Sequence, residues 1–418
     1  MTPADAHPSA VGPPQGDRPL RGRRREAPHR GDPTSVVKNR VLLVLVIGAA
    51  AAAWGLAFLT VAPNRLVTGT AIPLAQVSDP WRDLLLLPTA ILVLGIFLPQ
   101  RQRAHAAVAI AATLLLFGLT WLAGAHASRL AETASATSRT AFGGGFWLLA
   151  LLIWLAAVDA IERLRPGPVA ATLAHLSVLL PVVALLFAGE LEQLSLLREY
   201  ATRRDTFHVA LGRHVEIVTA ALLPTLLIGI PLGIALYRRA KSQAPVFAVL
   251  NVIQTVPSIA LLGLLMVPLA LLATALPGLR QFGISGIGMA PAVIALMLYS
   301  LLPVVRSTVA GLAQVPRPVV EAATGMGLTR GQIFSKVELP IALPVFFSGL
   351  RIAAVQAVGL AVVAALIGAG GLGALVFQGL ASGALDLVLL GVIPVIALAV
   401  VVDAAFRILG SCRSIPVA

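Results

Sequence analysis

The chain has 418 residues, of which 58% are hydrophobic and only 12% are charged. Soluble domains have about a quarter of their residues charged, so this composition excludes an ordinary soluble protein. The formal net charge of +13 would suggest a nucleic-acid partner in a soluble chain. Here, however, the basic residues gather near the N-terminus and in short loops between apolar runs, where they set membrane orientation. No nucleic-acid partner is therefore expected.

The N-terminal segment differs from everything that follows it. Residues 1–40 hold eight Lys/Arg against four acids, and the first 36 are rich in Pro, Gly, Arg and His without apolar periodicity. Such a segment cannot bury enough apolar surface to fold. We therefore expect residues 1–40 to form a disordered, basic cytoplasmic tail. A signal peptide is not expected, because the following apolar run is too long and begins too late.

Repeated apolar runs of about 20 residues indicate an all-α polytopic membrane protein, since an outer-membrane barrel would show short alternating strands. The long seventh run contains Pro257 and Pro268, where we expect the helix to break. About ten transmembrane helices are predicted, near residues 41–62, 84–98, 105–124, 142–161, 169–188, 214–237, 245–275, 288–312, 346–368 and 387–409.

The basic residues also predict how these spans are oriented. With the tail in the cytoplasm, the basic connections 100–103, 162–166 and 238–241 fall inside as well, as the positive-inside rule requires. The segment 189–213 argues against this orientation, because its four arginines would lie outside. The other loops outweigh it. Ten spans return the chain to its starting side, so both termini are predicted to be cytoplasmic.

Two parts of the membrane region differ in composition. All five tryptophans precede residue 166, whereas the part after 205 has none and is rich in Gly, Pro and small residues. We predict an accessory block of about five transmembrane helices over 41–188 and an amphipathic connector over 189–213. A five-helix core is predicted over 206–412, with a cytoplasmic loop at 313–345.

The loop 313–345 has the pattern of two short amphipathic helices. Pro318 suits the first turn of a helix, where its missing N–H costs nothing. Positions i, i+3, i+4 and i+7 of that helix are apolar and form one stripe. The stripe consists of Val319, Ala322, Ala323 and Met326.

A glycine joint separates these two helices. Gly325 and Gly327 allow the first helix to end in a left-handed residue. Thr329 and Gln332 make a capping box for the second helix. A shape of this kind suits docking in a groove of another protein. It is equally compatible with a loop that packs on its own helix bundle.

The stretch "EAATGMGLTRGQIFSKVELP" resembles the EAA loop of ABC-importer permeases, which has Glu-Ala-Ala, three residues, Gly, and nine residues before Ile-x-Leu-Pro. Val337 stands where isoleucine is usual. In that family the loop is the coupling helix seated in the ATPase subunit. The resemblance thus implies a type I ABC-importer permease core. The matching residues are Glu321, Ala322, Ala323, Gly327, Leu339 and Pro340.

More of the core is similar to one branch of this family, the osmoprotectant permeases for glycine betaine, choline and carnitine. The similar stretches lie within roughly residues 206–410, about half of the chain. The N-terminal helices carry no specific motif and are similar to this family only in that some of its permeases have a long form with extra N-terminal helices. The stretches that carry the likeness are 251–265, 290–312, 321–327, 338–353 and 367–373.

The resemblance implies a permease that moves an osmoprotectant such as glycine betaine, choline or another quaternary amine across the bacterial inner membrane. It implies a homodimer with separate ATPase subunits and an extracytoplasmic substrate-binding protein, besides the surrounding membrane lipid. The sequence itself has no G-x-x-x-x-G-K-[ST], so this chain is expected to use no ATP, to hold no cofactor and to be no enzyme. Two alternatives stay open: an ABC permease for an amino acid or other small solute, and an ion-coupled secondary transporter.

Polar side chains inside the predicted spans are candidates for the translocation pathway, because such residues are costly in a membrane. Asn251 and Gln254 share a helix face, and Thr255 and Tyr299 are further candidates. Ordinary hydrogen bonding between helices would explain them as well. Arg306 lies near the end of a predicted span, so we expect it to be an anchor at the membrane interface.

Two other patterns predict no ligand site. The run Gly368–Gly373 fits G-x-G-x-x-G, but no strand precedes it, so close helix approach or a bent re-entrant end is the better interpretation. The single cysteine, Cys412, and seven scattered histidines have no metal-ligand spacing, so no metal is expected.

Overall fold

The computed structural model describes residues 37–411 with the exception of 65, 66, 68, 78, 80, 134 and 136. Residues 1–36, which make up most of the predicted tail, lie outside the described residues. So do residues 412–418, including Cys412. The described chain is dominated by helices, as the all-α prediction required.

The N-terminal block combines helices with a small sheet that was not predicted. Its strands run in the order β2-β1-β3, with antiparallel pairing on both sides of β1. Two 3-10 turns, η1 and η2, precede α2. The elements are α1 (Arg40–Gly55), β1 (Ala57–Ala62), β2 (Thr70–Pro73), η1 (Leu74–Gln76), η2 (Arg82–Leu85), α2 (Leu86–Phe97), α3 (Gln102–Thr133), β3 (Arg139–Phe142), α4 (Gly144–Arg163) and α5 (Pro168–Phe187).

The second half of the chain is helical, with short 3-10 and π turns between its helices. Helix α12 runs through a π turn, Phe334–Glu338, directly into α13. The helices are α6 (Ser195–Thr202), α7 (Arg204–Arg238), α8 (Gln243–Thr255), α9 (Ser258–Ala275), α10 (Met289–Ala313), α11 (Arg317–Gly325), α12 (Arg330–Ile333), α13 (Leu339–Leu360), α14 (Leu372–Ser382) and α15 (Leu385–Ser411).

Eight helices in the described part of the chain are long and apolar enough to cross a membrane. They correspond to the third to tenth predicted spans and confirm the multi-pass membrane fold. The break predicted at Pro257 is confirmed, since α8 ends at Thr255 and α9 begins at Ser258. The break predicted at Pro268 is wrong, because α9 continues through it. Neighbouring groups can accommodate proline in a membrane helix.

The first two predicted spans are shorter than expected. Helix α1 ends at Gly55, and the last six residues of the predicted run 41–62 form strand β1, with Phe58 and Leu59 fully buried. A short apolar run rich in aromatic and β-branched residues suits a buried strand as well as a helix, so periodicity could not separate the two. Helix α2 has 12 residues, about 18 Å of helix, which is less than the roughly 30 Å of the hydrocarbon core.

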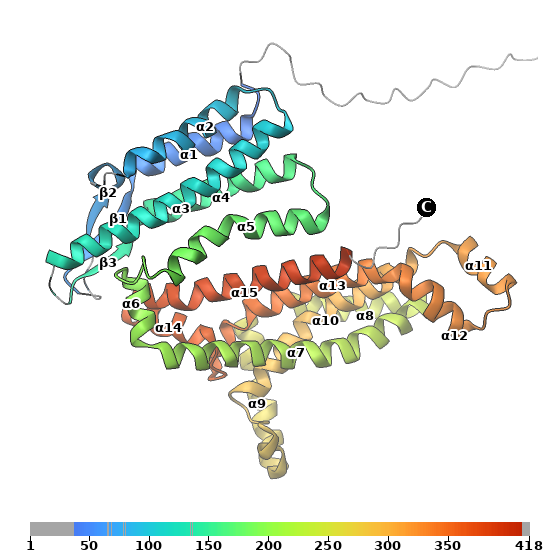
Figure 1. The fold of residues 1–418 in the computed structure, drawn as a ribbon. Coiled ribbons are helices and arrows are strands. Elements are labelled where there is room, and N and C mark those ends of the chain that lie inside the picture. The colour runs from blue at the N-terminus through green and yellow to red at the C-terminus, as the bar shows by residue number, and fades with distance from the viewer. Residues whose placement is uncertain are drawn as a thin grey trace, which may run out of the picture.

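Figure 1 shows how the two halves are arranged. Helices α1–α4 form one layer, and α5 lies between that layer and α15. The sheet lies near α6 at one end of the molecule, while α11 and α12 project at the opposite end. Helix α9 leaves the core bundle on the side away from the N-terminal layer. The N-terminal block has its own apolar core, centred on α3 and α4.

Glycines allow three core helices to approach closely. A Cβ atom at Gly233 of α7 would lie 2.6 Å from the Cβ of Thr308 on α10. A Cβ atom at Gly349 of α13 would overlap the side chain of Ser307, also on α10. Small residues at helix contacts are the usual means by which membrane helices pack tightly. Helix α10 is therefore enclosed by α7 and α13.

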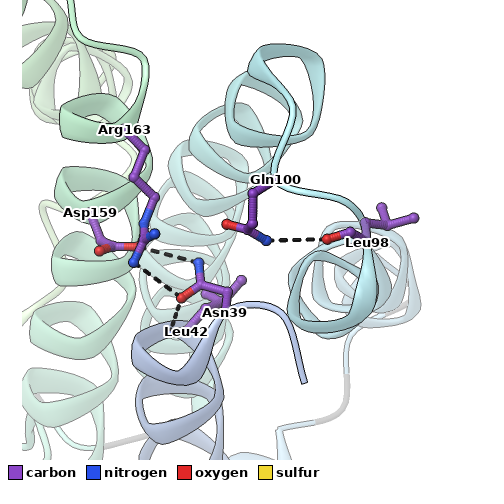
Figure 2. A network of polar contacts seen from close by, with 6 residues as sticks. All are labelled: Asn39, Leu42, Leu98, Gln100, Asp159 and Arg163. Atoms are coloured by element: carbon purple, nitrogen blue, oxygen red, sulfur yellow. Dashed lines mark hydrogen bonds and ion pairs between the residues drawn. The ribbon is translucent and has the colours of Figure 1, made fainter. Parts of the chain in front are cut away.

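A polar network joins the start of α1 to the end of α4 (Figure 2). Asn39 caps α1 by accepting a hydrogen bond from the Leu42 backbone N–H (3.0 Å), and its amide donates to Asp159 at 3.4 Å. Arg163 donates to Asp159 at 2.8 Å and to the Asn39 side-chain oxygen at 3.4 Å. The buried Asn39 therefore serves both the helix start and the contact between the two helices.

We expect Asn39→Ala to lower the free energy of unfolding of the N-terminal block by about 1–2 kcal/mol, because it removes a helix cap and two hydrogen bonds. Thermal unfolding of the purified protein in detergent, followed by tryptophan fluorescence, reports on this block, since it holds all five tryptophans. Gln100→Ala is the matched control, because the Gln100 side chain donates within its own turn to the Leu98 carbonyl (3.1 Å; Figure 2). Equal unfolding midpoints for the two variants would contradict the assigned role of Asn39.

Candidate functional site

Helices α11 and α12 form a projecting hook, defined here as residues 317–333. Helix α11 begins with Pro318 in its first turn, as predicted. At its end the Leu328 N–H donates to the Ala323 carbonyl (3.2 Å) and the Gly327 N–H to the Thr324 carbonyl (2.9 Å). This pair of bonds is a Schellman motif, which requires a left-handed residue after the helix. Gly327 supplies it with a φ of +80°.

The second helix of the hook has the predicted capping box. The Gln332 N–H donates to the Thr329 hydroxyl (3.4 Å), and the Thr329 N–H donates to the Gln332 side-chain oxygen (2.9 Å). From there the chain remains helical through the π turn into α13, with Pro340 in the first turn of α13. The hook is thus joined to a core helix by continuous helical backbone.

The hook leaves much of its apolar surface uncovered. Ala323 is 1% exposed and Ile333 is also buried, so these two residues hold the hook together. Met326 is 73% exposed, and Val319, Glu321 and Ala322 are exposed as well. The predicted stripe therefore divides into a buried position and an outward face that the described chain does not cover. Gly327 and Leu339 are also exposed, and Pro340 is half-buried.

The base of the hook contacts the end of α7. The guanidinium of Arg238 lies over the Phe334 ring, 5.6 Å from its centroid. A cation over an aromatic face is attractive. Helix α7 and the π turn before α13 are thus held together at this end of the core.

The four residues predicted for the pathway lie around the break between α8 and α9. Gln254 donates from its amide to the Tyr299 carbonyl at 2.7 Å, and the Tyr299 hydroxyl donates to the Val256 carbonyl at the break. The Asn251 side-chain oxygen accepts from Arg306 at 3.4 Å. Thr255 donates within its own helix. These contacts attach α8 to α10. Hydrogen bonding between helices therefore explains why Asn251, Gln254 and Tyr299 are polar, whereas it does not explain Thr255.

A cavity of about 330 Å³ lies between α8, α10 and α13. Of the four predicted residues, only Gln254 lines it; Tyr299 is buried but is not part of the lining. Sequence reasoning missed its other polar residues, and Arg306, predicted as an interfacial anchor, lines this cavity. The sequence did signal such residues, since each is a polar residue inside an apolar run. The direction in which its side chain points, however, depends on how the helices pack. The missed polar residues are Arg306, Ser307, Ser348 and Gln356.

The glycine run 368–373 forms a sharp bend between a 3-10 turn and α14. Gly368, Gly370 and Gly371 all have positive φ, between +79° and +82°. Side chains resist that conformation, so the run marks a turn at a helix end. Among the residues that the structure describes, no group of three His, Cys, Asp or Glu could hold a metal ion.

Comparison with known families assigns both halves of the chain. Residues 38–197 match a family described as the N-terminal domain of the ABC transporter permease YehY. Residues 225–411 match the binding-protein-dependent transport system inner membrane component.

Individual proteins match over about half of the chain. The osmoprotectant import permease OsmW of Salmonella typhimurium is 40% identical over 191 residues, 46% of this chain and 84% of its own length. The permease OsmY of the same organism is 42% identical over 193 residues, 46% of this chain and 75% of its own. A chain of the inward-facing MetNI methionine ABC transporter is 22% identical with a TM-score of 0.44, covering 51% of this chain and 99% of its own.

The fold and these matches define a multi-pass permease of the inner membrane. The chain belongs to the family of binding-protein-dependent transport system inner membrane components, the permeases of ABC importers. It has an N-terminal domain of the YehY kind in addition.

The Tyr299 hydroxyl should stabilise the junction of α8 and α9. Tyr299→Phe removes one hydrogen bond to the break, a net loss of about 1 kcal/mol. Local opening should therefore raise the amide hydrogen exchange of the junction about fivefold. Exchange measured by mass spectrometry over residues 252–262 checks this. Tyr237→Phe, in α7, is the control and should leave that segment unchanged; an equal effect of both variants would contradict the assignment.

Proposed function

We propose that this chain is the translocation subunit of an ATP-driven importer for osmoprotectants such as glycine betaine, choline or carnitine. The observation that carries the proposal is the exposed hook, which continues through a helical turn into a core helix. The substrate class is supported by the relatives, which are named for osmoprotectant, glycine betaine, carnitine and choline transport. An amino acid or another small solute is the alternative substrate.

The hook is the part that would sit in an ATPase subunit. Its outward residues, including Glu321, Ala322 and Met326, offer a mixed polar and apolar face to a groove. ATP is bound and hydrolysed by that partner, and this chain needs no cofactor of its own. Two copies of the permease form a homodimer above two ATPase subunits, and a substrate-binding protein delivers solute on the opposite face.

The path of the movement follows from the helix contacts. A shift of the hook moves α13, and α13 carries α10 with it because Gly349 places the two helices in close contact. The cavity between α8, α10 and α13 then changes shape. In this scheme Gln254, Arg306 and Gln356 line the solute's path, while Asn251, Thr255 and Tyr299 support the neighbouring helices.

The orientation and the division of the chain are part of the same proposal. In Figure 1 the α4–α5 connection, residues 164–167 with Arg165, lies at the same end of the molecule as the hook. That end is cytoplasmic, and so are both termini. We propose the same division of the chain: an accessory block over 41–188, a connector over 189–213, and a core over 206–412 with its coupling loop at 313–345.

Gly327→Val should uncouple the transporter. A positive φ costs a side chain about 1–2 kcal/mol, so the joint of the hook would be deformed, although nothing lies within 4 Å of the new Cβ. Substrate-stimulated ATP hydrolysis should therefore fall at least tenfold in the reconstituted importer. Gly325→Val is the matched control: this glycine is helical and equally open, and valine is no worse than glycine in a helix.

The readout must separate coupling from folding. Both variants should insert, purify and unfold like the wild-type protein, because the hook projects from the bundle (Figure 1). Normal stimulated hydrolysis by Gly327→Val would contradict a coupling role of the hook.

Recognition of the substrate should belong mainly to the binding protein. A quaternary ammonium is best bound by aromatic faces, yet the residues lining the 330 Å³ cavity include no aromatic side chain among those the structure describes. We expect the purified permease alone to bind glycine betaine or choline no better than roughly millimolar. Isothermal titration of the permease, paired with uptake assays of the complete importer, checks this.

The uptake assay tests the proposed function, and the titration tests which protein recognises the substrate. Uptake of glycine betaine that depends on ATP and on the binding protein supports the proposed function. Uptake of an amino acid alone would instead select the alternative substrate. Micromolar binding of betaine by the permease without partners would contradict the division of labour and place an aromatic site in this chain.

A further inference from the structure

The N-terminal block holds a cavity that takes no part in the pathway described above. Its volume is about 720 Å³, in the range of small-molecule sites. It lies between α1, α2, α3 and α4 and is bounded at one end by η1 and η2. Apart from a few polar groups its walls are apolar, including Val46, Ala50, Leu92, Leu119 and Ile153.

Two of the helices that line the cavity are short. Helices α1 and α2 have 16 and 12 residues, about 24 and 18 Å, so neither fills the roughly 30 Å hydrocarbon layer alone. Trp54, at the end of α1, lines the cavity and is 90% exposed. Exposed tryptophans favour the boundary between hydrocarbon and headgroups. The mouth of the cavity therefore lies just below the headgroups of the leaflet on the side of the sheet.

Two opposite charges stand at this end of the cavity. Arg82 donates to the Ala75 carbonyl (3.1 Å), which fixes η2 against η1, and its Nε lies 3.7 Å from an Asp83 carboxylate oxygen. Both side chains line the cavity and remain substantially exposed. A neighbouring cation and anion at the headgroup level complement the phosphate and the ammonium of a zwitterionic phospholipid.

We propose that this cavity is a binding site for a bilayer phospholipid. One acyl chain occupies the space between α1 and α2, and the phosphate lies against Arg82 with the ammonium beside Asp83. The apolar walls exclude water as the occupant. The neighbouring Arg82 and Asp83 at one end of an otherwise apolar cavity favour a zwitterionic phospholipid over an apolar helix of a second copy.

The acyl-chain part is tested by filling the cavity in the full-length protein. Ala50→Phe places a ring in the cavity from an exposed position. Ala51→Phe is the matched control, since Ala51 is the next residue of the same helix, exposed, and not part of the lining. Titration with palmitoyl-oleoyl phosphatidylethanolamine, read by native mass spectrometry, should show roughly tenfold weaker binding for Ala50→Phe, as displacing about two methylene groups predicts.

The headgroup part is tested separately. Arg82→Gln should weaken phosphatidylethanolamine binding about tenfold, the loss of one charge-assisted hydrogen bond, and should leave binding of dioleoylglycerol, which has no phosphate, unchanged. Equal phospholipid binding by wild type, Ala50→Phe and Ala51→Phe would overturn the proposal. Efficient oxidative cross-linking of two chains through Ala50→Cys, in a Cys412→Ala background, would overturn it too, since it would place a second copy at the cavity.

Discussion

The close contact of α10 with α7 and α13 is the constraint on which the rest of the core depends. In a membrane, apolar helices gain little from burying apolar surface against one another, so the tightness of packing decides how they associate. Gly233 and Gly349 let two neighbours approach α10 where side chains would collide. The 330 Å³ cavity lies beside this contact, and α13 continues into the hook. The shape of this cavity and the position of the hook are therefore set by the same helices.

The N-terminal block joins this core without entering its cavity. Its α5 contacts α15, and the connecting helix α6 contacts both β3 and α15. The Ser195 hydroxyl donates to Asp386 at the start of α15, and Arg198 donates to the Ser138 carbonyl in the loop before β3 (2.9 Å). The relatives described above match over 46% of this chain, and the N-terminal block matches a separate family model over residues 38–197. The N-terminal block has its own apolar core and contacts the second half of the chain mainly through α15. It is therefore built as a separate domain attached to the permease core.

Local chemistry made the hook predictable, whereas the sheet and the cavity depend on contacts between distant residues. Pro318, Gly327 and Thr329 each specify a helix start or end within a few residues, and all three act as expected. The long apolar runs predicted ten crossing helices, and eight of these correspond to helices in the described part of the chain that are long and apolar enough to cross a membrane. Strand β1 was missed because a short apolar run suits a helix end as well as a strand, and because one of its two partners, β3, lies far along the sequence. Ser348 and Gln356 were missed because only the packing of α13 on α10 turns them toward a cavity.

A double substitution at the contact of α7 and α10 tests most directly whether transport depends on this packing. In the importer reconstituted with its ATPase and binding protein, Gly233→Ala should abolish uptake, because the new Cβ meets the Cβ and Cγ2 of Thr308 at 2.6 and 2.8 Å. Adding Thr308→Gly removes both atoms and leaves the Val305 carbonyl oxygen at 3.2 Å, so uptake should return at least in part. Uptake at the wild-type rate by Gly233→Ala alone would contradict the account.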